Sequence, residues 1–571
     1  MFNCIHVAVA AVSCRVGARI ILAAALLPIV CHAQVPPDAG SLLKQIERPQ
    51  QPALPPKGEP QFLPPPVLSA FTGESIVVRE FQFAGNTRLA SKQLTVIVAG
   101  FKGRPLTFAE LQNAAIAVAT AYRKAGWIVR VYLPQQDVTQ GTVTIQIIEA
   151  KFGVVRVEGK THASAARLTR MVEHAQKSTQ TVNADSLDRA LLLVNDLPGV
   201  TAKGRLDEGQ NPGETDLVMT LADGRRVSGD IVADNGGARS TGLGRAIASA
   251  SLNSPFGLGD RIDAMLLHSL GSDYQRAGYS LPIGSDGWRL GVNGSHLRYR
   301  VVTAAFAALD AQGTSTTVGA EASYPLVRAS LHNLYFSFSL DDQRFDNKSM
   351  GFITSAYSVR SVRAGLYGNL FDTFGAGGAN NASISLEQGS VDLGNSPNEG
   401  ADALTTRTAG SFRKLNFSAG RQQAITSRFS LYADLSGQVA NKNLDSSEKF
   451  YLGGLNGVRA YPANEGGGST GVMLNLEARE RLPLNLDLTG FFDIGVVHFN
   501  KNNDFVGAAA PNRDELKGLG LTLGWTASMG LNLKATVARR IGSNPDRTST
   551  GTDQDGSLDM TRFWIQASVP F

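Results

Sequence analysis

The chain has 571 residues, which is too long for one ordinary domain. Its 54 basic and 49 acidic residues are nearly balanced, so the charge gives no sign of a nucleic-acid partner. The three cysteines, Cys4, Cys14 and Cys31, all lie in the first 31 residues. The remaining chain therefore excludes disulfides, cysteine metal sites and thiol catalysis.

The first 33 residues have the pattern of a secretory signal peptide. Arg15 and Arg19 precede an apolar run over 20–30, and a small residue, Ala33, follows. The run is too short to span a membrane as a helix. We expect cleavage between Ala33 and Gln34, and therefore an exported protein. A lipid-modified Cys31 is the less favoured alternative, because bulky Val30 precedes it.

Residues 34–66 predict a short helix on a stiff tether. Leu42, Leu43 and Ile46 share one face of a helix over 41–48, which Ser41 or Asp38 can cap. Eight prolines follow within 49–66, and such a segment extends by roughly 3 Å per residue. A helix on an extended tether is a movable part, and a disordered terminus is the alternative.

Residues 75–224 predict two similar α/β modules, 75–152 and 153–224, each a β-α-α-β-β unit. Apolar residues at helical spacing and strands bounded by glycine turns mark both units. The expected strands and helices are 76–87 with its Gly-Asn turn, 111–122, 128–133 and 142–149 in the first module, and 154–159, 163–175, 186–195 and 216–221 in the second.

From 225 to 571 the chain alternates apolar and polar residues between glycine-rich and polar turns. The alternating segments include 334–340, 431–435, 482–488 and 519–525, and the last strand places Phe563, Ile565, Ala567, Val569 and Phe571 on one face. No segment after the signal is apolar for eighteen residues, so a span requires a closed barrel. A spanning strand needs about 10 residues, and at roughly 22 residues per strand plus its connection the length predicts about sixteen strands, with fourteen or eighteen as alternatives. A half-buried strand of a soluble sandwich is the alternative for the terminal segment.

Several motifs resemble those of BamA-type outer-membrane proteins, and within them the two-partner secretion transporters. The loop 450–461 is similar to the family's Val-Arg-Gly-Tyr loop, with Ala460 in place of the usual glycine. Phe491, Asp493 and Gly495 match its Phe-x-Asp-x-Gly strand motif. The segments 41–48, 122–127, 133–137, 234–236 and 253–260 resemble its N-terminal helix, first POTRA module and first barrel hairpin.

The resemblance implies a transmembrane β-barrel of about sixteen strands over 225–571, preceded by two periplasmic POTRA domains, in the bacterial outer membrane. It implies export of a large unfolded exoprotein of the TpsA type, recognised through its N-terminal secretion domain, without a cofactor or nucleotide. Outer-membrane lipid and the barrel assembly machinery are the other expected partners, and we expect a monomer. A membrane-protein insertase of the same superfamily is the alternative, and a diffusion porin is a third possibility.

The resemblance also assigns roles to residues. The family's loop folds back into the barrel, where Arg459 would meet Asp493 as a partly solvated pair with Tyr461 packed beside it. Val458, Phe491 and Gly495 complete this expected loop lock, and the helix carrying Leu42, Leu43 and Ile46 would plug the resting lumen. No enzyme motif stands beside them: the eight histidines are scattered and none has metal-protease spacing.

Overall fold

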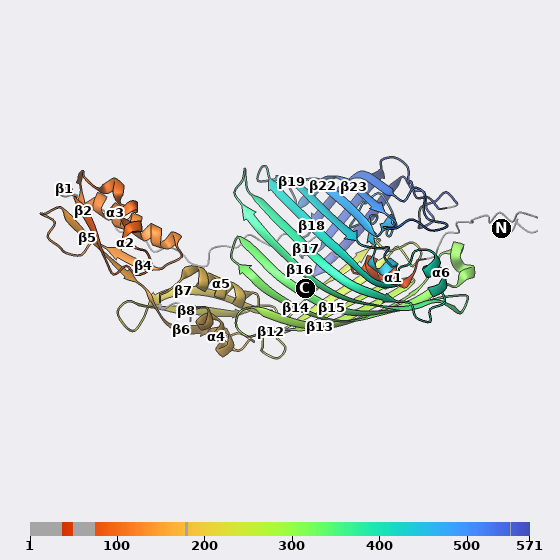
Figure 1. The fold of residues 1–571 in the computed structure, drawn as a ribbon, viewed down its shortest axis with the longest axis horizontal. Helices are drawn as coiled ribbons and strands as arrows, with labels where there is room; N and C mark the ends of the chain where they lie inside the picture. The colour runs from red at the N-terminus through yellow and green to blue at the C-terminus, as the bar shows by residue number, and fades with distance from the viewer. Residues whose placement is uncertain (1–36, 49–74, 177–180, 549) are drawn as a thin grey trace, which may run out of the picture.

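The computed structural model describes residues 37–48, 75–176, 181–548 and 550–571. The expected signal peptide, its Ala33–Gln34 cleavage site and the proline-rich tether lie outside these residues. Two small modules follow one another at one end of a large barrel (Figure 1). One further helix precedes both modules in the chain. Among the described helices, none is both long and apolar enough to cross a membrane.

The first module packs its helices on a three-stranded sheet of order β2-β5-β4. Thr107 begins α3 with a capping box, in which its hydroxyl accepts from the Glu110 amide and the Glu110 carboxylate accepts from the Thr107 amide. Its elements are β1 (Ile76–Val77), β2 (Glu80–Ala84), α2 (Ser91–Ile97), η1 (Ala99–Phe101), β3 (Pro105–Leu106), α3 (Phe108–Lys124), β4 (Val129–Tyr132) and β5 (Thr142–Glu149).

The second module repeats this plan with the sheet order β6-β8-β7. Buried Leu187, Leu191 and Leu217 lie in the core between its helices and sheet. Its elements are β6 (Lys151–Gly159), α4 (Ala165–Gln176), α5 (Ala184–Asn195), β7 (Val200–Glu208) and β8 (Glu214–Asp223). In the two three-stranded sheets, β2 pairs parallel to β5 and β6 pairs parallel to β8, which leaves the outer strands of each sheet with one free edge each.

Sixteen antiparallel strands close into a barrel, as the sequence predicts. They are β9 (Val227–Asp234), β10 (Arg245–Asn253), β11 (Arg261–Ser269), β12 (Ser272–Ile283), β13 (Trp288–Arg300), β14 (Gln312–Arg328), β15 (His332–Ser349), β16 (Phe352–Asp372), β17 (Gly378–Asp392), β18 (Gly410–Ala424), β19 (Phe429–Ala440), β22 (Thr470–Leu482), β23 (Leu486–His498), β24 (Asp514–Thr526), β25 (Asn532–Arg540) and β26 (Thr561–Pro570). The loops carry η2 (Ala304–Leu309), α6 (Glu399–Leu404), η3 (Ser446–Glu448), β20 (Phe450–Tyr451) and β21 (Gly467–Gly468). The ring closes where β26 pairs with β9.

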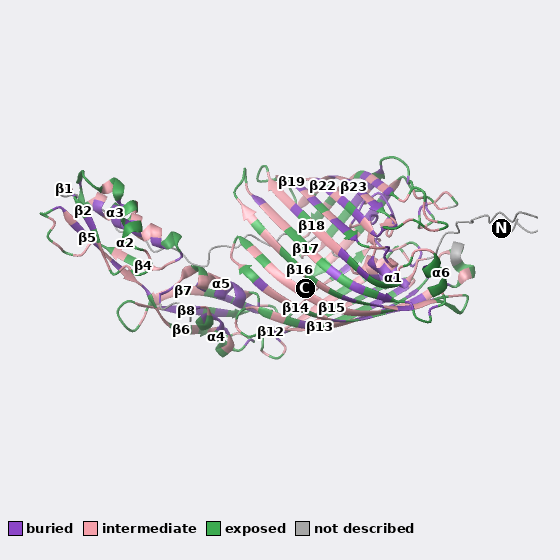
Figure 2. Ribbon diagram, viewed as in Figure 1, coloured by how far each residue is buried: buried purple, intermediate pink, exposed green. Residues whose placement is uncertain are grey.

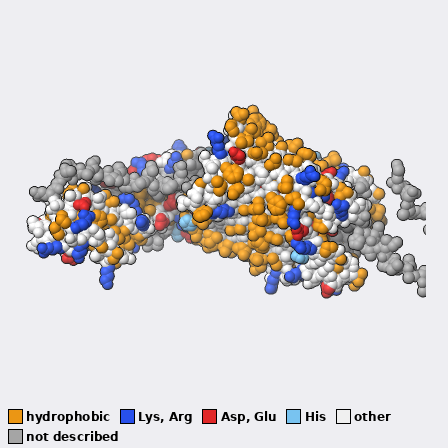
Figure 3. All heavy atoms as spheres, turned by 90° about the horizontal axis from the view of Figure 1, so that it is seen from above, with side chains coloured by type: hydrophobic (Ala, Val, Ile, Leu, Met, Phe, Trp, Pro, Cys, Tyr) orange, Lys and Arg blue, Asp and Glu red, His pale blue; other side chains and the backbone are white. Residues whose placement is uncertain are grey.

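Side chains alternate between the two sides of the barrel wall (Figure 2). On β26, Phe563 and Ile565 are 66% and 63% exposed, whereas the alternate residues Arg562 and Trp564 are buried. Hydrophobic side chains accordingly cover much of the outer surface (Figure 3). The alternating face of the terminal strand is therefore the outer face of a barrel and not the half-buried face of a sandwich.

One expected strand is a hairpin instead. The alternating segment 482–488 contains the turn between β22 and β23, with Leu482 paired to Leu486. Leu484 and Asn485 both have positive φ, at 64° and 58°. Alternation alone does not distinguish a strand from two strand ends joined by a tight turn.

The second module is fixed to the turns at the near end of the barrel. Arg328 pairs with Asp196 at 2.8 Å, and Arg189 donates to the Pro325 carbonyl at 2.9 Å. The Ser164 amide donates to the Gly257 carbonyl at 2.9 Å. These contacts define the end of the barrel that faces the modules, and the long loops lie at the opposite end.

Candidate functional site

The long loop over 441–469, between β19 and β22, turns back into the barrel. Its residues Val458, Ala460 and Tyr461 are fully buried and pack with Leu452 of the same loop and Leu516 of β24. The tip of a polar connection thus lies within the barrel interior rather than in solvent. The six residues expected to form the loop lock come from this tip and from β23.

Arg459 and Asp493 form a bidentate pair. The Arg459 Nε and Nη2 donate to the two Asp493 carboxylate oxygens at 2.9 and 2.7 Å, and the Arg459 amide donates to Oδ2 at 3.0 Å. Asn475 donates to Oδ1 at 2.7 Å. A planar guanidinium that meets a carboxylate at two atoms fixes both distance and orientation.

The rest of the guanidinium is also occupied. Its Nη1 donates to Glu477 of β22 at 2.8 Å, and its carbon lies 3.6 Å from the centre of the Phe491 ring. Burial lowers the pKa of Arg459, but the hydrogen bond and charge of Asp493 outweigh it and raise the pKa above its ordinary value. One arginine therefore joins the loop to two neighbouring strands and to an aromatic face.

Two details differ from the expectation. The pair is not partly solvated, because the Asp493 side chain is fully buried and the Arg459 side chain is 11% exposed. Tyr461 has another cationic partner, since its ring lies 4.4 Å from the guanidinium carbon of Arg540 on β25. Sequence reasoning placed the pair in an open lumen and missed that the loop itself excludes water from it.

Glycines on the wall make room for the loop. A Cβ at Gly495 would lie 2.5 Å from a Leu452 methyl group, and a Cβ at Gly518 would lie 2.5 Å from the Ala460 Cβ. The glycine of the Phe-x-Asp-x-Gly motif is thus the seat for Leu452. Ala460 stands where the family motif has glycine, and its methyl group fits because Gly518 on the facing wall has no side chain.

Four lock residues were not expected from the motifs: Asn475, Glu477, Arg540 and Trp564. Arg540 Nε donates to the Ala460 carbonyl at 3.2 Å, and Trp564 Nε1 donates to the Arg459 carbonyl at 2.8 Å. Alternation contains a signal for them. Asn475 and Glu477 share a face of β22, and Trp564 lies on the opposite face of β26 from Phe563.

The helix α1 (Ala39–Ile46) lies inside the barrel. Asp38 caps it by accepting from the Ser41 amide at 2.7 Å. Leu42 and Leu43 are buried against Leu297, Phe345 and other inward residues of β11–β17, with Ile46 partly buried beside them. Burying each leucine stabilises docking by about 1.5–3 kcal/mol.

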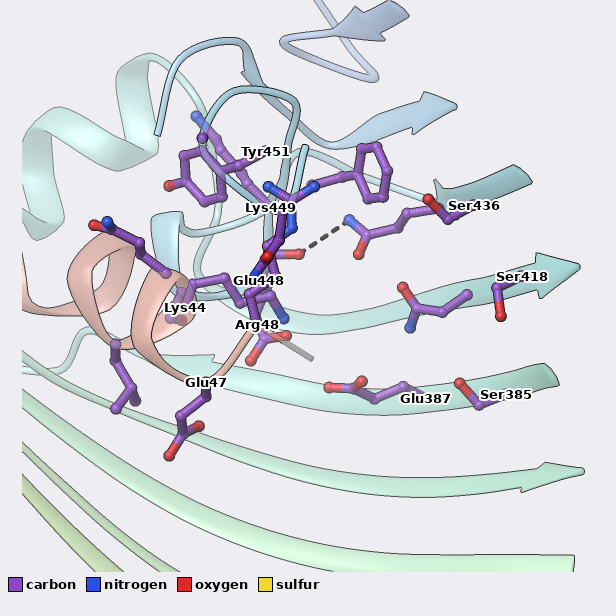
Figure 4. Close-up of a pocket in the computed structure, with 18 of the residues that line it drawn as sticks. Lys44, Glu47, Arg48, Ser385, Glu387, Ser418, Ser436, Glu448, Lys449 and Tyr451 are labelled. Atoms are coloured by element: carbon purple, nitrogen blue, oxygen red, sulfur yellow. Dashed lines mark hydrogen bonds between the residues drawn. The ribbon is translucent and has the colours of Figure 1, made fainter. Parts of the chain in front are cut away.

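The other face of α1 carries charge toward a polar cavity of about 590 Å³ (Figure 4). Buried Lys414 of β18 pairs with Glu448 and, at 3.5 Å, with Glu387 of β17. Burial and then the charge of Lys414 lower the pKa of Lys44 to about 8. The helix thus adds a cation to a cluster whose own cation is already paired.

The plug helix and the lock loop touch at both ends of α1. Ser446 donates to Asp38 at 2.9 Å, and Arg48 donates to the Gly453 carbonyl at 3.0 Å. Burial lowers the pKa of Arg48 to about 10. Within the described ranges, no three His, Cys, Asp or Glu residues are grouped to hold a metal ion.

Comparison with known proteins agrees with this architecture. Residues 213–517 match the family described as haemolysin secretion/activation protein ShlB/FhaC/HecB, and residues 76–150 match the ShlB-type POTRA domain. The heme/hemopexin transporter protein HuxB of Haemophilus influenzae is 27% identical over 94% of this chain and 95% of its own. The outer membrane transporter CdiB of Dickeya dadantii is 24% identical over 77% of this chain and 80% of its own.

The solved structure of CdiB from Escherichia coli has a similar fold, with a TM-score of 0.69 at 20% identity over 90% of this chain and 94% of its own. The matched family covers more than half of the chain, and the POTRA match covers the first module. The chain therefore belongs to the haemolysin secretion/activation family of ShlB, FhaC and HecB, the two-partner secretion transporters of the bacterial outer membrane.

Proposed function

We propose that this protein exports a large unfolded exoprotein of the TpsA type through its barrel, with α1 as the resting plug and Arg459 as the lock of the long loop. The observation that carries the proposal is the arrangement of α1 and the loop tip, which together fill one closed barrel next to two receptor modules. A passive porin needs no such modules. Members of this family are transporters and not enzymes.

The lumen chemistry supports passage of an extended chain. The cavity beside α1 is lined by the small hydroxyl side chains of Ser385, Ser418 and Ser436 and by Glu387 (Figure 4). These hydroxyl and carboxylate groups offer hydrogen bonds to a peptide backbone, beside apolar side chains such as Phe450, Leu455 and Met473 that line the same cavity. Folding outside the cell, worth roughly 5–15 kcal/mol per domain, would make passage one-way without nucleotide hydrolysis.

Release of α1 is the step that would open this path. The helix is joined to the first module only through residues 49–74. It can therefore leave the lumen while the first module and the barrel both stay folded. The lock loop would stay in place, because Asp493 holds the Arg459 backbone and side chain together. Its role is then to shape the path beside the wall of β22–β25.

Capture of the exoprotein is assigned to the second module. Its edge strand β7 exposes Thr201, Lys203 and Arg205 and pairs on one side only. A free edge accepts an extended segment through main-chain hydrogen bonds, which suits a client that must stay unfolded. We take 75–152 and 153–224 as the two POTRA domains, 225–571 as the barrel and 34–66 as plug and tether.

The remaining partners follow from the same reading. Outer-membrane lipid surrounds the aliphatic outer face, the barrel assembly machinery inserts the chain, and one copy suffices because plug, lock and lumen all belong to a single barrel. The signal peptide 1–33 directs the chain to the periplasm.

The experiment is reconstitution of export. A candidate exoprotein of the TpsA type, shortened to its N-terminal secretion region, is co-expressed with the transporter in a host that lacks a transporter for it. We expect the region in the culture medium only when the transporter is present, and photo-crosslinks from position 203 in β7 to exceed those from position 130 in β4. A client retained in the periplasm would contradict export, and a client embedded in the outer membrane would favour the insertase alternative.

A further inference from the structure

A groove of about 550 Å³ lies on the outside of the barrel, over β9–β13. Its floor is formed by Ala246 and Ala248 of β10, both exposed. The residues between and beside them face the lumen, where Arg245 pairs with Asp234 and Ile247 packs against the plug core. The alanines therefore face outward, and their short side chains leave the surface hollow.

Aliphatic side chains form the two walls of this groove. Ala248 lies opposite Ile231 of β9 on one side and Leu266 of β11 on the other. Ile231 and Leu266 are 56% and 57% exposed. A channel with an alanine floor and aliphatic walls, in a surface that faces lipid, matches the cross-section of a hydrocarbon chain better than a flat strand face does.

The groove becomes polar across the sheet, towards β12 and β13, where Gln275 and His296 continue the pairing row of Ala248 and Leu266. There it is lined by His268, Asp273, Gln275, His296 and Arg298. Asp273 lies 2.7 Å from His268, and His296 lies 3.0 Å from the Thr316 hydroxyl. Arg298 is exposed, and among the described residues it has no hydrogen-bond or ion-pair partner.

A second cation, whose side chain also has no partner in the described part of the chain, extends this polar side. Arg300 lies two residues beyond Arg298 on the same outer face of β13 and is also exposed. The apolar side chains of this face, Trp288, Leu290 and Val292, all lie nearer the modules. The cations thus begin where the aliphatic band ends, at the depth of lipid headgroups on the extracellular side.

We propose that this groove binds one phosphorylated glycolipid of the outer leaflet. An acyl chain lies over Ala246 and Ala248 between Ile231 and Leu266, and a sugar phosphate pairs with Arg298. Gln275 and His296 supply hydrogen bonds for the sugar hydroxyls. An unpaired arginine matches a phosphate group bidentately, and at the edge of an apolar groove it is less hydrated than in free solution. The proposal depends on the outer-membrane location alone and not on export.

The site lies beside the closing seam. Ile231 is on β9, which pairs with β26 from Asp234–Gln566 to Asp230–Pro570. A lipid held on β9–β13 packs against the strand that completes the ring. Binding to the closed barrel alone should therefore raise its thermal stability by mass action.

The test uses the purified full chain in detergent, with three probes: lipid A carrying two phosphates, dephosphorylated lipid A and phosphatidylglycerol. Native mass spectrometry counts retained lipid, and a melting curve records its effect. Ala248→Trp fills the groove and Arg298→Gln removes the phosphate partner. The matched controls are Ala433→Trp, an outward alanine of β19, and Arg413→Gln, an outward arginine of β18.

We expect wild type and both controls to retain one bisphosphorylated lipid A. Ala248→Trp should lose it at least tenfold, and Arg298→Gln should weaken only the phosphorylated form, roughly tenfold, as one charged hydrogen bond predicts. Arg298→Gln keeps the test informative if Ala248→Trp does not fold, which heat-modifiable gel mobility reports. Equal retention by the groove variants and their controls, or equal binding of phosphatidylglycerol, would overturn the proposal.

Discussion

The lock loop and the plug helix occupy the same lumen but are held in different ways. At the lock, every polar atom of the Arg459 side chain meets an acceptor, and the pair is sealed under Leu452 and Val458. At the plug, apolar contacts at Leu42 and Leu43 are combined with Lys44, a cation held in a site that lowers its pKa. We therefore expect the lock loop to stay in place during export and the plug helix to dissociate from the lumen.

The largest effect is expected at the lock. Arg459→Ala leaves Asp493 buried without its cation, which costs about 3–5 kcal/mol at a buried pair. We expect export to fall at least tenfold while the barrel still folds, and Arg459→Lys to fall nearly as far because it loses the bidentate contact. Arg479→Ala is the control, since Arg479 pairs with the other oxygen of Glu477. Normal secretion by Arg459→Ala would show that the pair has no role in export.

The plug should respond to loss of its apolar face. Deleting residues 34–60, or replacing Leu42 and Leu43 with Asp, removes the contacts that hold α1 against the wall. Two leucines contribute about 3–6 kcal/mol, so the open fraction should rise strongly. Planar-bilayer conductance measures it, with Gln45→Ala as the mild control. An unchanged conductance after the deletion would mean that α1 does not close the channel.

The fit between Ala460 and Gly518 gives a smaller and more specific test. Gly518→Ala places a methyl group 2.5 Å from the Ala460 Cβ, so one side must shift, at a cost of about 1–3 kcal/mol. We expect increased protease cleavage in the loop 441–469 and a modest loss of export. The double variant with Ala460→Gly should recover both. If the double variant were as impaired as Gly518→Ala alone, the contact between positions 460 and 518 would not be the cause of the loss.

The smallest effect is that of pH on the plug. Burial first and the charge of Lys414 second hold the pKa of docked Lys44 at about 8, below its ordinary 10.5. Between these values the docked helix binds fewer protons than the released helix, so docking strengthens as pH rises from about 8 towards 10.5 and is weakest, and nearly independent of pH, below about 8. Open probability should fall from about pH 7 to about pH 9.5.

Glu448 and Lys449 also have shifted pKa values, raised and lowered respectively by burial first, so the Lys44→Met variant is the comparison. It removes the charge and keeps the stem. Its conductance should be lower than that of wild type at neutral pH and nearly flat with pH. The same slope in both proteins would assign the pH dependence to other groups.

Hydrophobic alternation and motif spacing along the sequence predict much of this architecture. Alternation over 225–571 predicts the sixteen-stranded barrel because each strand has a lipid side and a lumen side. The motif spacing of Phe491, Asp493 and Gly495 places three inward residues on one strand, and the structure brings them to Val458, Arg459 and Tyr461. These contacts were predictable in kind, and their role in export stays a prediction.

Local sequence patterns do not predict the contacts between residues that are far apart in the chain. The burial of Asp493 depends on Leu452 and Leu516, and the partner of Tyr461 is Arg540, nearly eighty residues away. Alternation wrongly predicts a strand at the turn of Leu484, because the hydrophobic pattern continues through it. The lowered pKa of Lys44 likewise depends on burial first and then on Lys414 of β18, which is far away in the chain and in no local pattern with it.

The most direct test of the whole account holds the plug in place. The Ser446 Oγ and Asp38 Oδ1 atoms lie 2.9 Å apart. Because no cysteine follows Cys31 in the sequence, Asp38→Cys combined with Ser446→Cys offers one disulfide crosslink between the plug helix and the lock loop. Export is compared under oxidising and reducing conditions, with each single variant as control. The account predicts that the oxidised pair stops export and keeps conductance low, and that reduction restores export. Undiminished export by the fully crosslinked protein would contradict it.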